Sequence, residues 1–154
     1  MSKKIKNVCN GQFGHLYLNG VEVFMVQSFS AELKMDLEEL KANGSWEKGF
    51  KLKDISLEGK FKVKYVDSMG LKDMVAMMKK GITPTFKITS SLEDPEQFHG
   101  QIEQIYIGEA FIEKLPLADW EINKMVEKEF SFKANPQSLN ILKEILDEDG
   151  IKVA

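Results

Sequence analysis

The pattern of apolar and polar residues near the start of the chain predicts a β-hairpin. The Asn19-Gly20 pair stands between two short alternating runs, and this dipeptide is the strongest short-range signal for a two-residue type I′ turn. Such a turn fixes the register of the two strands, so that Leu18 lies opposite Val21. The same register extends the predicted pairing over residues 13–26.

The second face of this hairpin is apolar, whereas a half-buried hairpin normally has one polar face. Something else must therefore cover it. Two covers remain open: a second subunit, or the helix that we predict for residues 68–80 of the same chain. The candidate inter-subunit contacts on this face are Phe13, Tyr17, Phe24 and Val26.

Residues 21–37 combine the composition of a helix with the periodicity of a strand. Most residues in the second half of this segment are good helix formers. In a helix, however, Met35 would lie on the side opposite to Leu33 and Leu37, whereas in a strand all three share one face. The periodicity therefore predicts one long strand over residues 21–37.

A long loop is predicted at residues 41–54, because two glycines interrupt this segment and no period is sustained. Long loops in compact domains are usually functional or mobile. Trp46 and Phe50 lie in this charged stretch, and exposed aromatic residues often anchor protein interfaces. We therefore count both residues among the candidate inter-subunit contacts.

The remaining pattern completes a mainly β fold. Alternation predicts further strands at residues 59–65, 85–89, 98–107 and 126–132. Helical spacing predicts one internal helix over residues 68–80, and Asn135-Pro136 predicts the start of a C-terminal helix that ends near Leu146. We expect an antiparallel β-barrel or sandwich with one flanking helix and a C-terminal helix.

The length of 154 residues suggests a single domain over residues 1–154. Within this domain we distinguish three special parts. They are an N-terminal segment at 1–12, the long loop at 41–54, and the C-terminal helix and tail at 135–154.

Composition and charge argue against most catalytic and binding classes. The net charge of −3 argues against a protein that grips nucleic-acid phosphates, and no apolar run reaches the length of a transmembrane helix. The single cysteine, Cys9, cannot form an internal disulfide, which fits a reducing compartment. No metal-ligand spacing, phosphate loop or nucleophile with a base is recognisable. We therefore expect no enzymatic activity, no cofactor and no metal.

Two groups of charged residues could suggest chemistry but have a simpler interpretation. Lys60, Lys62 and Lys64 share one face of a predicted strand in a chain of net negative charge. Such a row is typical of a solvated or ion-paired surface rather than of a nucleic-acid contact. Glu127 and Glu129 likewise share an outward face of the last predicted strand, so acid–base catalysis is not expected there.

The order and spacing of several motifs resemble a known family. The motifs are the glycine and hairpin pattern of residues 11–20, the alternating residues 29–33, the strand at 59–65 and the helix that ends in Lys79-Lys80-Gly81. Together they resemble the tail tube proteins of contractile-tailed phages and phage-tail-like particles, above all those of defective prophages of Gram-positive bacteria. The resemblance covers about residues 10–133.

This resemblance implies a structural protein that assembles with itself. In the family, subunits close into a hexameric ring with a continuous inner sheet, and the rings stack into a hollow tube inside a contractile sheath. The implied partners are further copies of the chain, the tail sheath protein, and baseplate or tail terminator proteins. The implied location is the bacterial cytoplasm during synthesis and, after assembly, a virion tail or an R-type bacteriocin particle.

Two other functions stay open at this point. The tube protein of a type VI secretion system shares the fold that the resemblance implies. A small β-barrel that carries a ligand belongs to a different class, and it would require an apolar cavity and a monomeric state.

Overall fold

The computed structural model describes residues 5, 8–23, 25–64, 71–96 and 101–146. Strands dominate this part of the chain, and they are antiparallel throughout, as the sequence predicts. In chain order the elements are η2 (Gly11–Phe13), β1 (Gly14–Leu18), β2 (Val21–Glu22), β3 (Val26–Leu40), β4 (Gly49–Lys64), α1 (Leu71–Lys79), β5 (Thr85–Leu92), β6 (Glu103–Lys114), β7 (Glu127–Ala134), η4 (Pro136–Ser138) and β8 (Leu139–Lys143).

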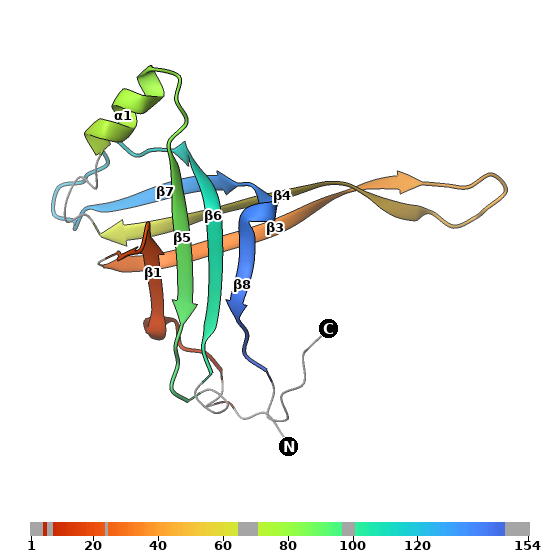
Figure 1. The fold of residues 1–154 in the computed structure, drawn as a ribbon, viewed down its shortest axis with the longest axis horizontal. Coiled ribbons are helices and arrows are strands. Elements are labelled where there is room, and N and C mark those ends of the chain that lie inside the picture. The colour runs from red at the N-terminus through yellow and green to blue at the C-terminus, as the bar shows by residue number, and fades with distance from the viewer. Residues whose placement is uncertain (1–4, 6–7, 24, 65–70, 97–100, 147–154) are drawn as a thin grey trace.

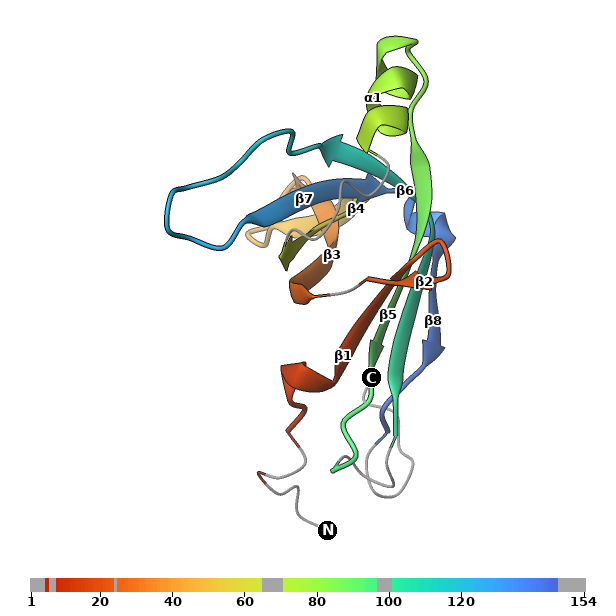
Figure 2. The same ribbon diagram turned by 90° about the vertical axis from the view of Figure 1, so that its left-hand side faces the viewer.

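The strands form two layers that cross each other (Figures 1 and 2). An upright layer consists of β1, β5, β6 and β8, with the short β2 beside β1. A crossing layer consists of β7, β4 and β3. β6 belongs to both layers, because its first half pairs with β8 and its second half pairs with β7. The core lies between the two layers.

Phenylalanine side chains fill much of this core. Phe132 is fully buried, and its ring stacks on Phe29 with 6.0 Å between the ring centroids and meets Phe86 edge-on. Gly59 lies directly opposite Phe132 on the neighbouring strand. A Cβ atom at Gly59 would collide with the carbonyl oxygen of Ser30 and with the Phe132 ring. The aromatic core therefore packs against bare backbone at this point.

The predicted hairpin turn and its register are confirmed, but β2 ends at Glu22, so the strand pairing does not extend over residues 13–26 as predicted. β1 and β2 pair so that Leu18 lies opposite Val21. Asn19 and Gly20 have φ angles of 53° and 82°, and the type I′ turn requires positive values at both positions.

The predicted single strand over residues 21–37 is wrong at its start. β2 ends at Glu22, and β3 begins only at Val26. Between them Met25 has a φ of 62°, a left-handed conformation that interrupts any strand. From Val26 onward the strand interpretation is confirmed, and β3 continues to Leu40.

The predicted loop at residues 41–54 is wrong in its second half. β4 begins at Gly49 and pairs with β3, and the two strands project together from the layers as an arm (Figure 1). We call residues 33–55 the arm. A register shift opposite residues 36 and 37 puts Leu52 and Ile55 on one face of the ribbon although they are three positions apart. This bulge hides the alternation of the strand in the sequence.

The predicted C-terminal helix is also wrong. Residues Pro136–Ser138 form a 3₁₀ turn, and the strand Leu139–Lys143 follows. Because β7 pairs only with the second half of β6, the first half offers a free edge, where Ile141 pairs with Ile105. This pairing between distant segments outweighs local helix propensity. Residues 147–154 of the predicted tail lie outside the described residues.

The internal helix is confirmed over Leu71–Lys79, and its predicted start falls within residues 65–70, which lie outside the described residues. None of its side chains is buried. The helix stands beyond the end of the upright layer and does not lie over the β1–β2 hairpin (Figures 1 and 2). It therefore does not supply the cover that we considered for the second face of that hairpin.

The other predicted strands are confirmed with shifted ends. They correspond to the second half of β4 and to β5, β6 and β7. The end of β6 lies at Lys114 rather than at residue 107, and residues 98–100 of the predicted strand lie outside the described residues.

Candidate functional site

The arm carries an exposed apolar face. Side chains at paired positions of an antiparallel ribbon lie on the same side. On one side of the arm, all but one of the side chains at paired positions of β3 and β4 are apolar. Two of them, Met35 and Ile55, are 58% and 44% exposed. We define the apolar face of the arm by Leu33, Met35, Leu37, Phe50, Leu52 and Ile55.

The opposite face of the arm is polar and charged. Like charges directly opposite each other destabilise a ribbon unless water screens them. This side of the arm is therefore suited to solvent. Its cross-strand pairs are Lys34 with Ser56, Asp36 with Asp54, Glu38 with Lys51, and Leu40 with Gly49, and the pair of Glu32 with Glu58 lies just before the arm.

The apolar face of the arm continues the core of the protein. Leu57 is 3% exposed, whereas Ile55, the next residue on the same side of β4, is largely uncovered. Leu57 lies beside Ala134 at the end of β7, and the pairing of β4 with β7 stops there. Leu57 and Ile55 are thus both aliphatic and lie on the same side of β4, but other parts of the chain bury only Leu57. The arm extends core-type residues beyond the layers that would bury them.

The tip of the arm presents a tryptophan to solvent. Trp46 is 97% exposed in the turn between β3 and β4. Local contacts shape this turn: the Ser45 hydroxyl oxygen accepts a hydrogen bond from the Glu47 amide at 3.1 Å, and Lys48 lies 3.0 Å from the Glu39 carboxylate. The turn is thus held by polar contacts that do not involve the indole ring.

A hollow lies at the other end of the molecule, between β1 and the start of β3. Val23 and Val26 pack against the core from this hollow, while Met25 is 42% exposed. At its rim, His15 Nδ1 lies 2.8 Å from Glu22 Oε1. The lining residues, which define the hollow, are Gly14, Leu16, Glu22, Val23, Met25 and Val26.

The structure separates the predicted contact residues into two groups. Trp46 and Phe50 lie at the outer end of the arm, whereas Phe13, Tyr17 and Val26 lie near the hollow end. Phe13 is exposed, Tyr17 is half-buried on the outer side of the upright layer, and Val26 packs against the core. The sixth candidate, Phe24, lies outside the described residues.

Two apolar surfaces escaped the sequence analysis. The first is the aliphatic part of the apolar face of the arm, whose signal in the sequence was the unbroken alternation of β3 up to Leu37. The second is the loop between β6 and β7, which extends away from the upright layer (Figure 2). Trp120, an aromatic residue among charged neighbours like Trp46, was its signal. The exposed apolar residues of this loop are Leu117, Trp120, Ile122 and Met125.

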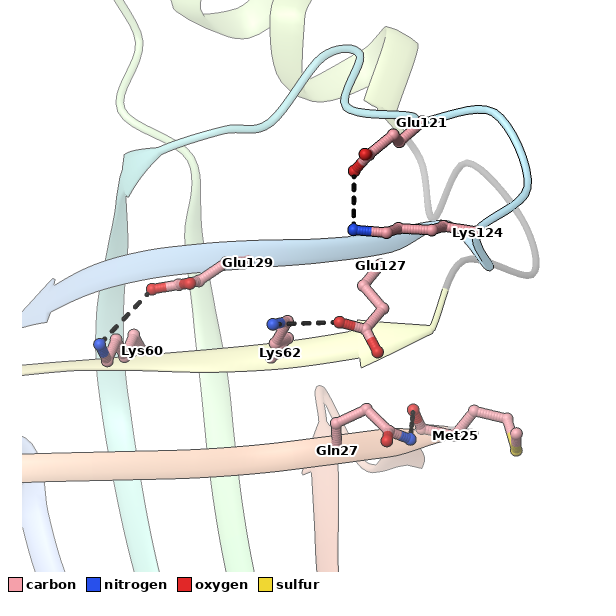
Figure 3. A network of polar contacts seen from close by, with 8 residues as sticks. All are labelled: Met25, Gln27, Lys60, Lys62, Glu121, Lys124, Glu127 and Glu129. Atoms are coloured by element: carbon pink, nitrogen blue, oxygen red, sulfur yellow. Dashed lines mark hydrogen bonds and ion pairs between the residues drawn. The ribbon is translucent and has the colours of Figure 1, made fainter.

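Two lysines of the row on β4 are ion-paired, in agreement with the predicted ion-paired or solvated face. Lys60 lies 3.6 Å from Glu129, and Lys62 lies 3.0 Å from Glu127 on the neighbouring strand (Figure 3). The hydrogen bond and charge of Glu127 raise the pKa of Lys62 above its ordinary value. These carboxylates and lysines therefore satisfy each other on a solvated face, and the two glutamates are not arranged as a catalytic pair.

A family model described as phage tail tube protein matches residues 1–135. The chain belongs to the phage tail tube protein family. Two proteins of Bacillus subtilis (strain 168) are similar to it over 133 residues, at 24% identity. They are the uncharacterized protein YqbM and the phage-like element PBSX protein XkdM, and the match covers 86% of this chain and 90% of each relative.

Solved structures of contractile particles share the tail tube fold of this chain. The tube-terminating cap of the anti-feeding prophage gives a TM-score of 0.70 at 12% identity, and covers 94% of this chain and 97% of its own. A chain of the sheath–tube complex of an extracellular contractile injection system gives 0.68 at 13% identity, with 91% and 95% covered. The likeness at such low identity concerns the fold, which tube and cap chains have in common.

Two other kinds of site are absent from the described ranges. No three His, Cys, Asp or Glu side chains in this part of the chain converge to hold a metal ion. Among the helices of the same residues, none combines the length and the apolar character needed to cross a bilayer.

Proposed function

We propose that this chain is the building unit of a tail tube. Its copies close into hexameric rings, and the rings stack into the inner tube of a contractile phage tail or of a phage-tail-like particle. The observation that carries this proposal is the apolar face of the arm, which continues the core into solvent. Membership of the phage tail tube protein family supports this assembly as the one that the surface serves.

Physical reasoning supports self-assembly as the role of the arm. Each fully buried aliphatic side chain contributes about 1.5–3 kcal/mol relative to an exposed one. Several such side chains stand uncovered on one ribbon, and contiguous exposed apolar patches mark interaction sites. A long strand edge is also an aggregation hazard in a monomer. A closed ring covers both the apolar face and the edge of β3.

The proposed role is mechanical rather than catalytic. The charged pairs on β4 and β7 neutralise each other, and the conspicuous exposed residues are aliphatic or aromatic. Such surfaces bind other proteins and hold them in register. The further partners that we propose are the tail sheath protein at the outside of the tube, and baseplate and terminator proteins at its ends.

The test compares two variants that each add one carboxylate to the arm. Met35→Asp places the charge on the apolar face, whereas Ser56→Asp places it on the charged face, opposite Lys34. Burying an unpaired carboxylate costs several kcal/mol at every contact. We expect the unaltered chain and Ser56→Asp to form rings and tubes in analytical ultracentrifugation and electron microscopy, and Met35→Asp to remain a folded monomer.

Two results of this experiment would reject the proposal or change it. A chain that stays monomeric up to millimolar concentration would reject the proposal and favour the small ligand-binding β-barrel. Single rings that do not stack would favour a terminator, since caps share this fold.

A further inference from the structure

We infer that Asn43, at the tip of the arm, is a site of spontaneous deamidation, where the next backbone amide and water convert the side-chain amide into a carboxylate. The chain contains three Asn-Gly pairs, at residues 10–11, 19–20 and 43–44. Glycine after asparagine favours this reaction, because it has no side chain to shield its amide nitrogen. The folded structure distinguishes the three pairs, and this distinction does not depend on the proposed tube.

The reaction needs only water as a second reactant. The Gly44 amide nitrogen attacks Cγ of Asn43, the new C–N bond closes a five-membered imide, and Nδ2 leaves as ammonia with the proton of the Gly44 amide. Water then opens the imide: attack at Cγ gives aspartate, and attack at the main-chain carbonyl carbon gives isoaspartate. Because Cγ must first reach the glycine nitrogen, an asparagine side chain that is held elsewhere reacts slowly.

Asn19 is held by the neighbouring strand, although it is exposed. Its side-chain Oδ1 accepts a hydrogen bond from the Lys87 amide at 2.9 Å, and its own amide donates one to the Lys87 carbonyl oxygen at 2.9 Å. Its turn also joins the pair of Leu18 with Val21. The Asn19 side chain can therefore approach Gly20 only after contacts between separate strands have opened.

Asn10 is held at both its side chain and its backbone. Its Oδ1 accepts a hydrogen bond from the Gln12 amide at 3.0 Å, as the cap of η2. Its own amide donates to Oδ2 of Asp94 at 2.8 Å. Asp94 is itself buried, and its Oδ1 accepts a hydrogen bond from the Glu96 amide at 2.9 Å. The segment around Asn10 is thus fixed to the end of the upright layer.

Asn43 has no comparable restraint. It lies between the last residue of β3 and the first of β4, at the far end of the arm (Figure 1). The Ser45 amide donates to the Ala42 carbonyl oxygen at 3.1 Å, and Gly44 has a φ of 76°, as in a type II turn. Among the described residues, neither the Asn43 side chain nor the Gly44 amide has a hydrogen-bond partner. Asn43 can therefore turn toward Gly44 without losing a hydrogen bond of its own.

The products change both the charge and the backbone of the tip. Either product adds one negative charge beside the exposed Trp46. Glu47 is already present in this turn, and Lys48 is paired with Glu39 at 3.0 Å. Isoaspartate also inserts one extra carbon into the backbone of the turn. We expect this product to break the hydrogen bond between Ser45 and Ala42.

Peptide mapping by mass spectrometry tests the inference on the folded chain. The purified protein is incubated in mildly alkaline buffer, digested with trypsin and compared with a sample taken at the start. Fragment ions locate each converted asparagine and separate aspartate from isoaspartate. We expect conversion at Asn43 to be at least about tenfold faster than at Asn10 or Asn19, because each of these must first open two hydrogen bonds.

The same chain unfolded in guanidinium chloride is the control for sequence effects. There the three Asn-Gly pairs lose their different restraints, and we expect them to convert at similar rates. A tenfold preference for Asn43 that persists in the unfolded chain would overturn the inference, because the neighbouring residues rather than the fold would then cause it. Equal rates at the three sites of the folded chain would overturn it as well, as would no conversion at Asn43.

Asn43→Gln is the matched variant. It keeps an uncharged amide at the tip, but the corresponding attack would close a six-membered ring, which forms much more slowly. We expect the acidic form of the protein in isoelectric focusing to be lost from this variant, while the circular dichroism spectrum and the slow conversion at Asn10 and Asn19 stay unchanged. An acidic form that accumulates as fast in Asn43→Gln as in the unaltered chain would place the reaction elsewhere and overturn the inference.

Discussion

The base and the arm of the β3–β4 ribbon share one sequence pattern but have different environments. Along both, apolar side chains occupy one side and charged side chains the other. At the base the apolar side lies against the upright layer, and Leu57 and Phe61 are buried. On the arm the same side is open to solvent. The comparison teaches that amphipathic alternation shows which side of a ribbon is apolar. It does not show whether other segments of the same chain bury that side.

The largest effect is expected where the base of the ribbon meets the core. Phe132→Ala removes a fully buried ring that touches Phe29 and Phe86. We expect the free energy of unfolding of the dilute, unassembled subunit to fall by about 3–5 kcal/mol. Urea denaturation followed by circular dichroism measures this loss. An unchanged midpoint would mean that the crossing layer is not the centre of the core.

A matched pair of leucines tests the comparison directly. Leu57→Ala, at the base, should lower the free energy of unfolding by about 2–5 kcal/mol. Leu37→Ala, on the arm, should change it by no more than about 0.5 kcal/mol in the unassembled subunit, because Leu37 is half exposed there. The same denaturation experiment compares the two. Equal losses would contradict the difference in burial.

A pair of glycines on β4 sharpens the same contrast. A Cβ atom at Gly59 collides with backbone and with Phe132, whereas one at Gly49, on the arm, meets only the Leu40 carbonyl oxygen at 3.7 Å. We expect Gly59→Ala to cost about 1–3 kcal/mol through overpacking. Gly49→Ala should be close to neutral. Thermal unfolding of both variants, with calorimetric midpoints, checks the order.

The smallest effect is expected on the charged side of the ribbon. Glu127 raises the pKa of Lys62 in the folded state, so this stabilisation is fully present below the ordinary lysine pKa of about 10.4 and is lost as the pH rises through the raised value. Lys62→Met should therefore lower the unfolding midpoint slightly at pH 8, and the difference should vanish near pH 12.

Lys34→Met is the control for this pH dependence on the arm. Lys34 lies opposite Ser56 rather than a carboxylate. Asp54 and Glu58 lie only at the diagonal positions across from Lys34, so its replacement should lower the midpoint of the unassembled subunit by less than Lys62→Met does at pH 8. A loss at pH 8 as large as that of Lys62→Met would mean that the ion pair with Glu127 is not the cause.

Local signals in the sequence predicted the hairpin turn, the internal helix and the strand character of residues 26–37. Each depends on the sterics of a few neighbouring residues, such as the positive φ angles of Asn19 and Gly20. The candidate contact residues Trp46 and Phe50 were also identified from a local signal, because they are aromatic residues among charged neighbours. Their role as contacts stays a prediction.

Non-local pairing produced what the sequence analysis missed. Residues 139–143 have the composition of a helix, yet they form a strand because β6 offers them a free edge. The bulge opposite Leu37 conceals the strand that completes the arm. The hollow also arises from distant segments, since β1, β2 and β3 meet there.

The sequence by itself determined the alternation of the ribbon, the turn of the first hairpin and the motifs that resemble tail tubes. Only the tertiary structure decided where the upright layer ends, and therefore which of the alternating residues are buried and which remain on the exposed arm. The reason is physical: alternation is a local property of a strand, whereas burial depends on which distant segment lies across it.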